Sequence, residues 1–253
     1  MWFDLDQCVG HIRPFVEQLA SNRDRDRVPF GERHDRYEHH LVQLEIIRRL
    51  HAIHPRLAIG MEMFQQPFQD VLDDYIAGTL SEQEMLRRSE YYQRWRFDFR
   101  LYAPILRYAR ANQLPVIALN LPAELTQKVG RNGLDGLTVE EQAQLPAEID
   151  RSDSAYAQQL RDVFAQHPGN DRSFDNFLEV QLLWDEGMAQ RAADYLAAHR
   201  FEGHFKSHVA HNGNHQSVSG KFLPLFHVSR AYGHNVVAVH HISLCIGKDG
   251  AVC

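Results

Sequence analysis

The sequence lacks several features that would assign it to a common class of protein. It has three cysteines, Cys8, Cys245 and Cys253, and neither their odd number nor their spacing suits a disulfide framework or a zinc site. No run approaches the roughly 18 consecutive apolar residues of a membrane-spanning helix. A Walker loop, a G-x-S-x-G motif and an H-E-x-x-H motif are all missing. These absences argue against the most familiar nucleotide-binding and hydrolytic classes.

Charge of one sign is not concentrated anywhere in the chain. The 27 basic and 33 acidic residues are mixed and give a net charge of −6. Without a basic stripe, we expect no nucleic-acid partner. The opening segment MWFDLDQCVGHIRPF has neither the basic start nor the apolar stretch of a signal peptide. Leu5 precedes Cys8 by three residues, but Asp6 and Gln7 stand where a bacterial lipoprotein signal has small residues, so we expect no lipobox.

Short apolar runs alternate with helical patterns along the chain. Runs at 28–30, 57–62, 115–120 and 235–247 have the length and composition of buried strands, and the stretch 63–112 has a helical pattern throughout. This alternation predicts an α/β fold with a mostly parallel sheet flanked by helices. The segment from about 121 to 200 has no strand signal. We therefore expect a single domain over 1–253 with a smaller helical subdomain inserted at about 121–200.

Two capping boxes mark expected helix starts. Ser81 is followed three residues later by Glu84, and Thr138 is followed three residues later by Glu141. In this motif the hydroxyl and the carboxylate satisfy each other's backbone amides at the first turn of a helix.

Polar residues follow the predicted strands at the points where the strands end. Glu32 and His34 follow the first strand, Glu62 ends the second and Asn120 ends the third. Ligands of open parallel sheets bind beyond the carboxyl ends of the strands. If the strands are neighbours, these side chains converge at one edge and can hold a divalent metal or act as a general base with its orienting partner. The competing interpretation is that the glutamates cap helices or form ion pairs.

A second unusual feature is the aromatic and arginine-rich segment SEYYQRWRFDFRLYAPILRYAR, which begins at residue 89. It is either a core-facing helix with a solvated basic face or a platform for a flat, anionic ligand. Haem suits the second interpretation, because it needs a phenolate or imidazole for iron, aromatic rings for the macrocycle and arginines for the propionates. The candidates are Tyr91, Tyr92, Arg94, Trp95, Arg96, His39 and His40. Adjacent helical residues point about 100° apart, so only one tyrosine of the pair can face a given ligand.

Several segments together resemble the ChaN-like family of haem-binding uptake proteins, within a superfamily that includes Tiki, TraB and erythromycin-esterase-type proteins. The matching segments are GERHD…HH…QLE, AIGMEMFQ, YYQRWRFDFRLYAPIL, VIALNLP and LLWDEGMAQR, over roughly residues 30–200. The resemblance implies haem as the cofactor, a homodimer formed on haem binding and a role in bacterial iron uptake. It also implies a lipoprotein in the periplasm or anchored to the outer membrane, with an outer-membrane haem receptor as a partner.

The wider superfamily also suggests an alternative function, a metal-dependent hydrolase. Its shared polar set corresponds here to Glu32 with His34, Glu62, and the late Gly-x-His of Gly213 and His215. The segment before that motif, HFKSHVAHNGNH, departs from the apolar strand that the family pattern leads one to expect. Its histidines could bind a metal from one helix face, but the glycine and the asparagines favour a loop.

Overall fold

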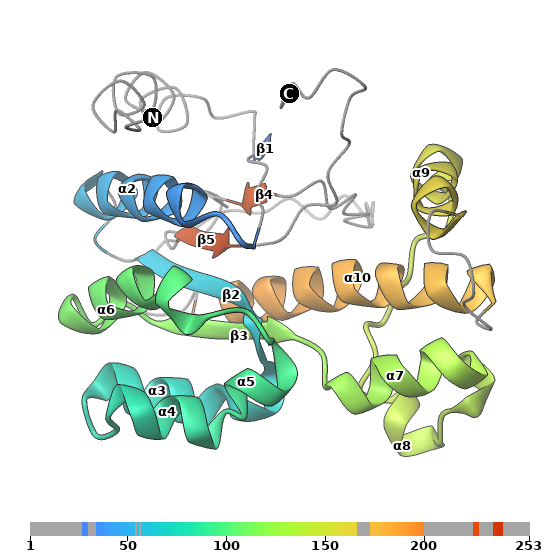
Figure 1. Ribbon diagram of the computed structural model, residues 1–253, viewed down its shortest axis with the longest axis horizontal. Coiled ribbons are helices and arrows are strands. Elements are labelled where there is room, and N and C mark those ends of the chain that lie inside the picture. Colours follow the sequence, from blue (N-terminus) through green and yellow to red (C-terminus); the bar gives the residue numbers. More distant parts are fainter. Residues whose placement is uncertain are drawn as a thin grey trace, which may run out of the picture. The chain divides into compact units, whose positions relative to one another are not determined.

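The computed structural model describes residues 27–29, 34–53, 55, 57–165, 173–199, 225–227 and 235–239. The chain divides into two compact units. Unit 1 is Met1–Ala118 with Leu223–Cys253, and unit 2 is Leu119–Phe222. Figure 1 labels the helices and strands of both. Among the described residues no helix is long and apolar enough to cross a membrane.

A three-stranded sheet forms the centre of the fold. Strand β2 (Leu57–Gln65) lies between β3 (Val116–Asn120) and β5 (Asn235–Val239). β2 and β5 are parallel, with Leu57 opposite Asn235 and Met61 opposite Val239. Every residue of β2 and β3 is buried, which explains their nearly continuous apolar sequence. The prediction of an α/β fold is confirmed.

Two of the predicted strand positions need correction. β1 (Arg27–Pro29) does not join β2; it pairs antiparallel with β4 (Leu225–His227) in a separate ribbon. β2 continues to Gln65 rather than ending at Glu62, because the following Met63 and Phe64 are apolar residues that the buried strand accommodates. Glu62 therefore lies inside the strand instead of at its end. The expected end of the third strand at Asn120 is correct.

The remaining elements of unit 1 are helical. They are α2 (Tyr37–Ile53), η1 (Gln66–Phe68), α3 (Gln69–Ala77), α4 (Glu82–Arg88), α5 (Tyr91–Arg94), η2 (Phe99–Leu101) and α6 (Ala103–Ala111). Helices α3, α4 and α5 lie side by side (Figure 1). Their apolar faces join a single core whose fully buried members include Ile46, Ile47, Ile59, Met61, Leu72, Met85, Ile105 and Leu106.

The side chain of Gln69 fastens the start of α3 to β3. Its amide nitrogen donates to the Val116 carbonyl at 2.8 Å, and its amide oxygen accepts from the Ala118 amide at 2.9 Å. These two backbone groups point away from β2, since the Ile59 amide bonds to the carbonyl of Pro115 on the other side. The glutamine thus satisfies backbone groups that would otherwise be buried without partners.

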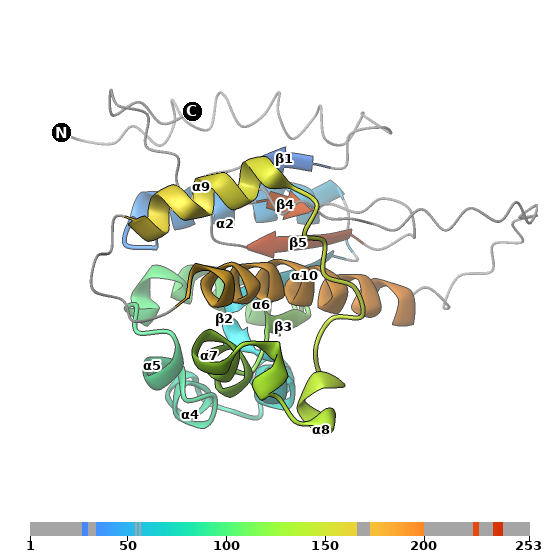
Figure 2. The same cartoon turned by 90° about the vertical axis from the view of Figure 1, so that its right-hand side faces the viewer.

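Unit 2 is helical after the end of β3 in its described part. It contains α7 (Ala123–Asn132), η3 (Leu134–Gly136), α8 (Val139–Gln142), α9 (Ser154–Ala165) and α10 (Phe174–Ala198). Helix α10 lies between α7 and α9, as both views show (Figures 1 and 2). A Cβ atom at Gly187 would stand 2.8 Å from the Leu121 side chain, so this close approach requires glycine. That 121–200 forms an insertion within one domain stays a prediction.

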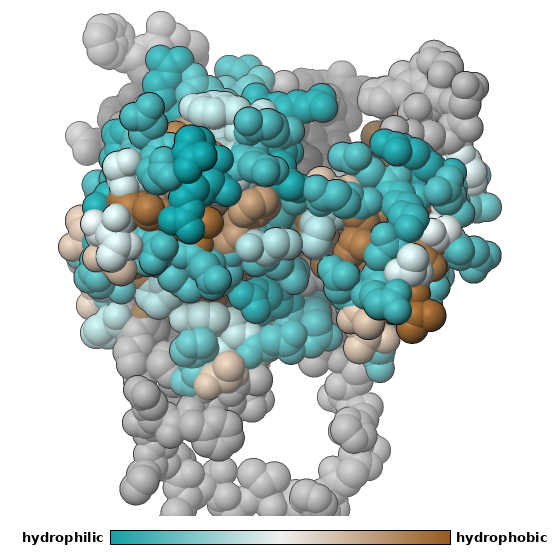
Figure 3. Space-filling view, turned by 90° about the horizontal axis from the view of Figure 1, so that it is seen from below, coloured by the Kyte–Doolittle hydropathy of each residue, from teal (hydrophilic) through white to brown (hydrophobic). Residues whose placement is uncertain are grey.

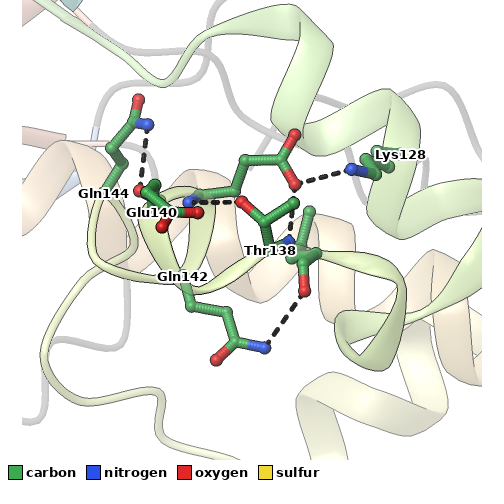
Figure 4. Close-up of polar contacts among 7 residues, drawn as sticks. Lys128, Thr138, Glu140, Gln142 and Gln144 are labelled. Carbon is green, nitrogen blue, oxygen red and sulfur yellow. Dashed lines mark hydrogen bonds and ion pairs between the residues drawn. The ribbon is translucent and has the colours of Figure 1, made fainter.

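The predicted capping box at Thr138 starts α8. The Thr138 hydroxyl accepts from the Glu141 amide at 3.3 Å, and the Glu141 carboxylate accepts from the Thr138 amide at 2.7 Å. Lys128 of α7 adds an ion pair to the same carboxylate at 2.6 Å (Figure 4). At the other expected box, Ser81 caps α4 by accepting from the Glu84 amide, while the Glu84 carboxylate bonds Arg87.

Candidate ligand-binding site

Helix α5 carries three of the seven predicted haem-binding residues, Tyr91, Tyr92 and Arg94, and the backbone on either side of it is unusual. It is four residues long and is preceded by Glu90, which has a left-handed φ of 52°. After Trp95 the chain turns left-handed again at Arg96, with φ 71°. Residues other than glycine occupy this region uncommonly and at a cost in energy. The segment is therefore fixed by contacts around it rather than by its own helical preference.

The tyrosine pair separates as helical geometry predicts. Tyr91 is fully buried, with its ring 5.4 Å from Phe99 and 5.7 Å from Phe64 between centroids. Tyr92 is 53% exposed, and the edge of one ring meets the face of the other at 5.2 Å. Tyr91 is thus a core anchor, whereas Tyr92 offers a phenol to the surface. The roles in binding stay predictions.

Arg94 is already engaged within the protein. Its guanidinium bonds the Glu90 carboxylate at 2.8 Å and the Gln65 side-chain oxygen at 2.6 Å, and it lies 4.9 Å from the centre of the Phe68 ring. Only 18% of its side chain is exposed. The geometry therefore gives Arg94 the task of joining α5 to the end of β2, which suits a propionate ligand less well than an exposed arginine would.

Trp95 and His34 belong to one ring cluster. The His34 imidazole lies 4.7 Å from the Trp95 ring and 4.7 Å from the Phe97 ring, and its Nδ1 is 3.4 Å from the Tyr102 hydroxyl. The indole N–H of Trp95 is buried and has no hydrogen-bond partner among the residues that the structure describes. A buried hydrogen-bond donor of this kind lowers the stability of the fold unless an acceptor binds it. His34 is held by aromatic rings here, which differs from the predicted metal-ligand setting.

The two adjacent histidines lie in the first turn of α2. His40 is 1% exposed, with Nδ1 3.1 Å from the Gln43 side-chain oxygen and Nε2 3.3 Å from the His34 carbonyl. Its ring also meets Tyr102 edge to face at 4.4 Å. Both ring nitrogens are thus occupied, and His40 is poorly placed to ligate iron. His39 is half-buried, which leaves it the better histidine candidate.

The predicted metal set can be followed only in part. Glu32 and His215 lie outside the described residues, as does the expected closeness of Glu32 to Glu62. Glu62 is 8% exposed within β2, and Asn120 is 8% exposed with a side-chain oxygen that has no hydrogen-bond partner in the described part of the chain. In the described part of the chain, no group of three or more His, Cys, Asp or Glu side chains could hold a metal ion. The hydrolase alternative gains no specific support.

Two arginines that follow α5 are exposed, Arg96 and Arg100, and Arg100 is bonded through its Nε to Asp98 at 2.8 Å. The hydrogen bonds with Asp98 raise the pKa of Arg100, and the Tyr92 phenol acts in the same direction. The face in Figure 3 is mostly hydrophilic, with separate apolar spots.

Gln65 and Glu90 were missed by sequence reasoning, although they position Arg94. Glu90 precedes Arg94 by four residues, a spacing that favours an ion pair on a helix, so the sequence did contain this signal. Gln65 lies 29 positions from Arg94, and only the fold brings them together.

These observations define a class of protein with an α/β fold and an aromatic, arginine-rich segment beside the sheet. The sequence profile of haem-binding uptake proteins of the Tiki superfamily, ChaN, matches residues 18–215. The chain therefore belongs to this family, which confirms the resemblance. Its fold is similar to that of ChaN of Campylobacter jejuni, whose structure shows cofacial haem binding. The TM-score is 0.52, with 17% identity over 74% of this chain and 70% of that chain. No curated protein matches.

Proposed function

We propose that this protein binds haem and serves in bacterial haem or iron uptake. The observation that carries the proposal is the α5 segment, residues 90–100, which contains an exposed phenol and exposed arginines on a base of packed aromatic rings. Haem has a flat apolar macrocycle, two carboxylates and an iron atom that accepts an anionic oxygen ligand. The described residues fit that chemistry, because Tyr92 is 53% exposed and Arg96 and Arg100 are exposed cations.

Within this proposal, Tyr92 is the iron ligand and Tyr91 its support. Tyr91 packs under Tyr92 with the ring planes at 89°, which restricts the motion of the outer ring. Trp95 lies in the next turn and supplies apolar surface together with a buried indole N–H. Arg94 holds the segment through Gln65, and Arg100 is bonded to Asp98, so the propionates fall to Arg96.

Titration of the purified protein with haemin tests the function. We expect a Soret band distinct from that of free haemin, saturating at micromolar ligand. If the spectrum at every ratio equals that of free haemin in the same buffer, the protein does not bind haem and the proposal is wrong.

Two matched substitutions test the ligand. Tyr92→Phe removes only an exposed hydroxyl, so it should abolish a tyrosinate-type spectrum and weaken haemin binding about tenfold or more, which corresponds to about 1.4 kcal/mol. Tyr91→Phe removes a hydroxyl in the core and should leave the spectrum unchanged. If both variants keep the wild-type spectrum and affinity, the ligand lies elsewhere and His39 is the next residue to test.

The partners complete the proposal. We propose a homodimer that forms on haem binding, an outer-membrane haem receptor as the source or acceptor of haem, and a periplasmic or outer-membrane-anchored location. Size-exclusion chromatography with and without haemin tests the dimer. An elution volume that does not change at saturating haemin would contradict dimer formation on haem binding.

A further inference from the structure

Five described residues have a left-handed backbone, and all of them follow or end a helix. They are Gly78, Glu90, Arg96, Gln113 and Gly133. Glycine adopts this conformation without strain, which explains Gly78 after α3 and Gly133 after α7. The other three pay a conformational cost of about 1–2 kcal/mol each, because the Cβ atom approaches the following carbonyl. Their side chains therefore need a reason to be present.

Two of these three side chains have such a reason inside the protein. The Glu90 carboxylate accepts from Arg94 at 2.8 Å. The Gln113 amide donates to the carbonyls of Ile76 at 2.8 Å and Arg110 at 2.9 Å. Glu90 and Gln113 therefore make interactions that a glycine at the same position could not make.

Arg96 is different. Its φ of 71° equals that of Gly133, yet within the described part of the chain no hydrogen bond or ion pair engages its guanidinium. It is also exposed. Arginine at this position therefore costs stability and returns no hydrogen bond or ion pair among the described residues, which is the pattern expected where a residue serves a ligand at the expense of the fold.

The position of Arg96 indicates which ligand group it meets. Residues 91–94 are helical and Trp95 keeps a right-handed backbone with φ −104° and ψ −37°, so the Cα of Arg96 follows Tyr92 by one helical turn. Arg100 is also exposed, but its guanidinium already bonds the Asp98 carboxylate. The unengaged Arg96 guanidinium, one helical turn from an exposed phenol, suits a flat ligand that carries carboxylates, since arginine pairs with carboxylates through two parallel hydrogen bonds.

We propose that Arg96 is a specificity-determining residue that selects the free dicarboxylate form of the tetrapyrrole, and that the protein keeps arginine there at a cost in stability. This inference rests on the proposed haem-binding function. It predicts opposite effects of one substitution: Arg96→Gly strengthens the fold and weakens binding.

The experiment uses three variants of the full chain and two probes. Arg96→Gly removes both the strain and the charge, Arg96→Met removes only the charge, and Gln113→Gly removes strain at a site away from α5. Thermal unfolding of the ligand-free proteins measures stability. Titrations with haemin and with haemin dimethyl ester, whose propionates carry no charge, measure recognition of the carboxylates.

Expected results separate strain from charge. The melting temperature of Arg96→Gly should rise by about 2–4 °C, while that of Arg96→Met should stay within about 1 °C of wild type. Both should bind haemin about tenfold more weakly than wild type and bind the ester as wild type does. Gln113→Gly loses two hydrogen bonds as it loses strain, so it should gain no stability and keep wild-type binding.

Each contrary result has a distinct meaning. If wild type binds neither probe, the proposed function fails and the specificity role falls with it. If wild type binds haemin but the two Arg96 variants bind it equally well, or if wild type does not prefer haemin to its ester, only the role of Arg96 is wrong. If Arg96→Gly melts below wild type, the argument from strain is wrong.

Discussion

Two of the aromatic clusters with arginines among the described residues, one from each unit, differ in chemistry. In unit 1 the α5 segment, residues 90–100, combines tyrosine and tryptophan with exposed arginines. In unit 2 three phenylalanines, Phe164, Phe174 and Phe177, form a cluster between α9 and α10 with centroid distances of 5.2–6.4 Å. Arg161 lies 4.0 Å from the centre of the Phe174 ring.

The difference shows that an aromatic and arginine-rich composition does not by itself make a binding site. The phenylalanine cluster has no oxygen or nitrogen atom to offer a ligand, and its arginine is stacked on one of its own rings. The Tyr156 phenol of unit 2 is not part of that cluster, and its hydroxyl donates to Asp185 at 2.6 Å. Of the two clusters, only the α5 segment combines an exposed phenol with exposed arginines.

The largest effect is expected from Tyr91→Ala, which removes the ring that supports the α5 segment. Tyr91 is fully buried and contacts three aromatic rings, so truncation should cost about 3–5 kcal/mol of the free energy of unfolding. Chemical denaturation followed by circular dichroism measures this loss. Tyr91→Phe is the control, since it keeps the packing, and should cost about 1 kcal/mol or less. Equal, small losses for both variants would mean that Tyr91 is not the anchor.

A smaller effect is expected from Phe177→Ala in the unit 2 cluster. Phe177 is half-buried, so its truncation should cost about 1–2 kcal/mol. Haemin binding, measured on protein confirmed to be folded, should match wild type. A loss of haemin affinity as large as that of Tyr92→Phe would break the contrast between the two clusters.

Much of the fold was readable in the sequence because local patterns determined it. The buried strands at 57 and 116, the capping box at Thr138 and the long helix from Phe174 each follow from periodicity or from a motif within a few residues. The placement of β1 was not readable. Its pairing with β4 joins residues about 200 positions apart, and a three-residue run carries no signal that names its partner.

The site was readable as residue types but not as roles. The 100° rule separated Tyr91 from Tyr92 without saying which one faces inward, because that depends on Phe64 of β2 and on Phe99. Arg94 and Arg96 looked equivalent in the sequence. Their roles diverge because Arg94 reaches Gln65, whereas Arg96 comes after the left-handed turn, and a backbone angle leaves little trace in composition.

The third prediction concerns Glu186 in unit 2. Burial raises the pKa of Glu186, the nearby carboxylates of Asp185, Asp150 and Glu148 also raise it, and the Asp150 amide works against them. Because the pKa of Glu186 is higher in the folded protein than its unfolded-state value of 4.5, the protein loses stability as the pH rises from 4.5 through the folded-state pKa. Glu186→Gln should therefore melt above wild type at pH 7 and with wild type at pH 4. A constant difference at both values would contradict this assignment.

The smallest effect is expected from Arg161→Met, which tests whether the unit 2 arginine has any task beyond its own cluster. The guanidinium lies over the Phe174 ring at 4.0 Å on an exposed part of α9, where a cation–π contact is worth about 0.5–1 kcal/mol. Methionine keeps an unbranched stem against the ring and removes the charge, so the loss in the free energy of unfolding should not exceed about that amount. Haemin affinity should be unchanged, in contrast to the tenfold loss expected for Arg96→Met. Measuring these two arginine-to-methionine variants together compares the effect on haemin affinity of removing one positive charge from each cluster. Equal losses of haemin affinity would show that overall charge, rather than the α5 segment, governs binding.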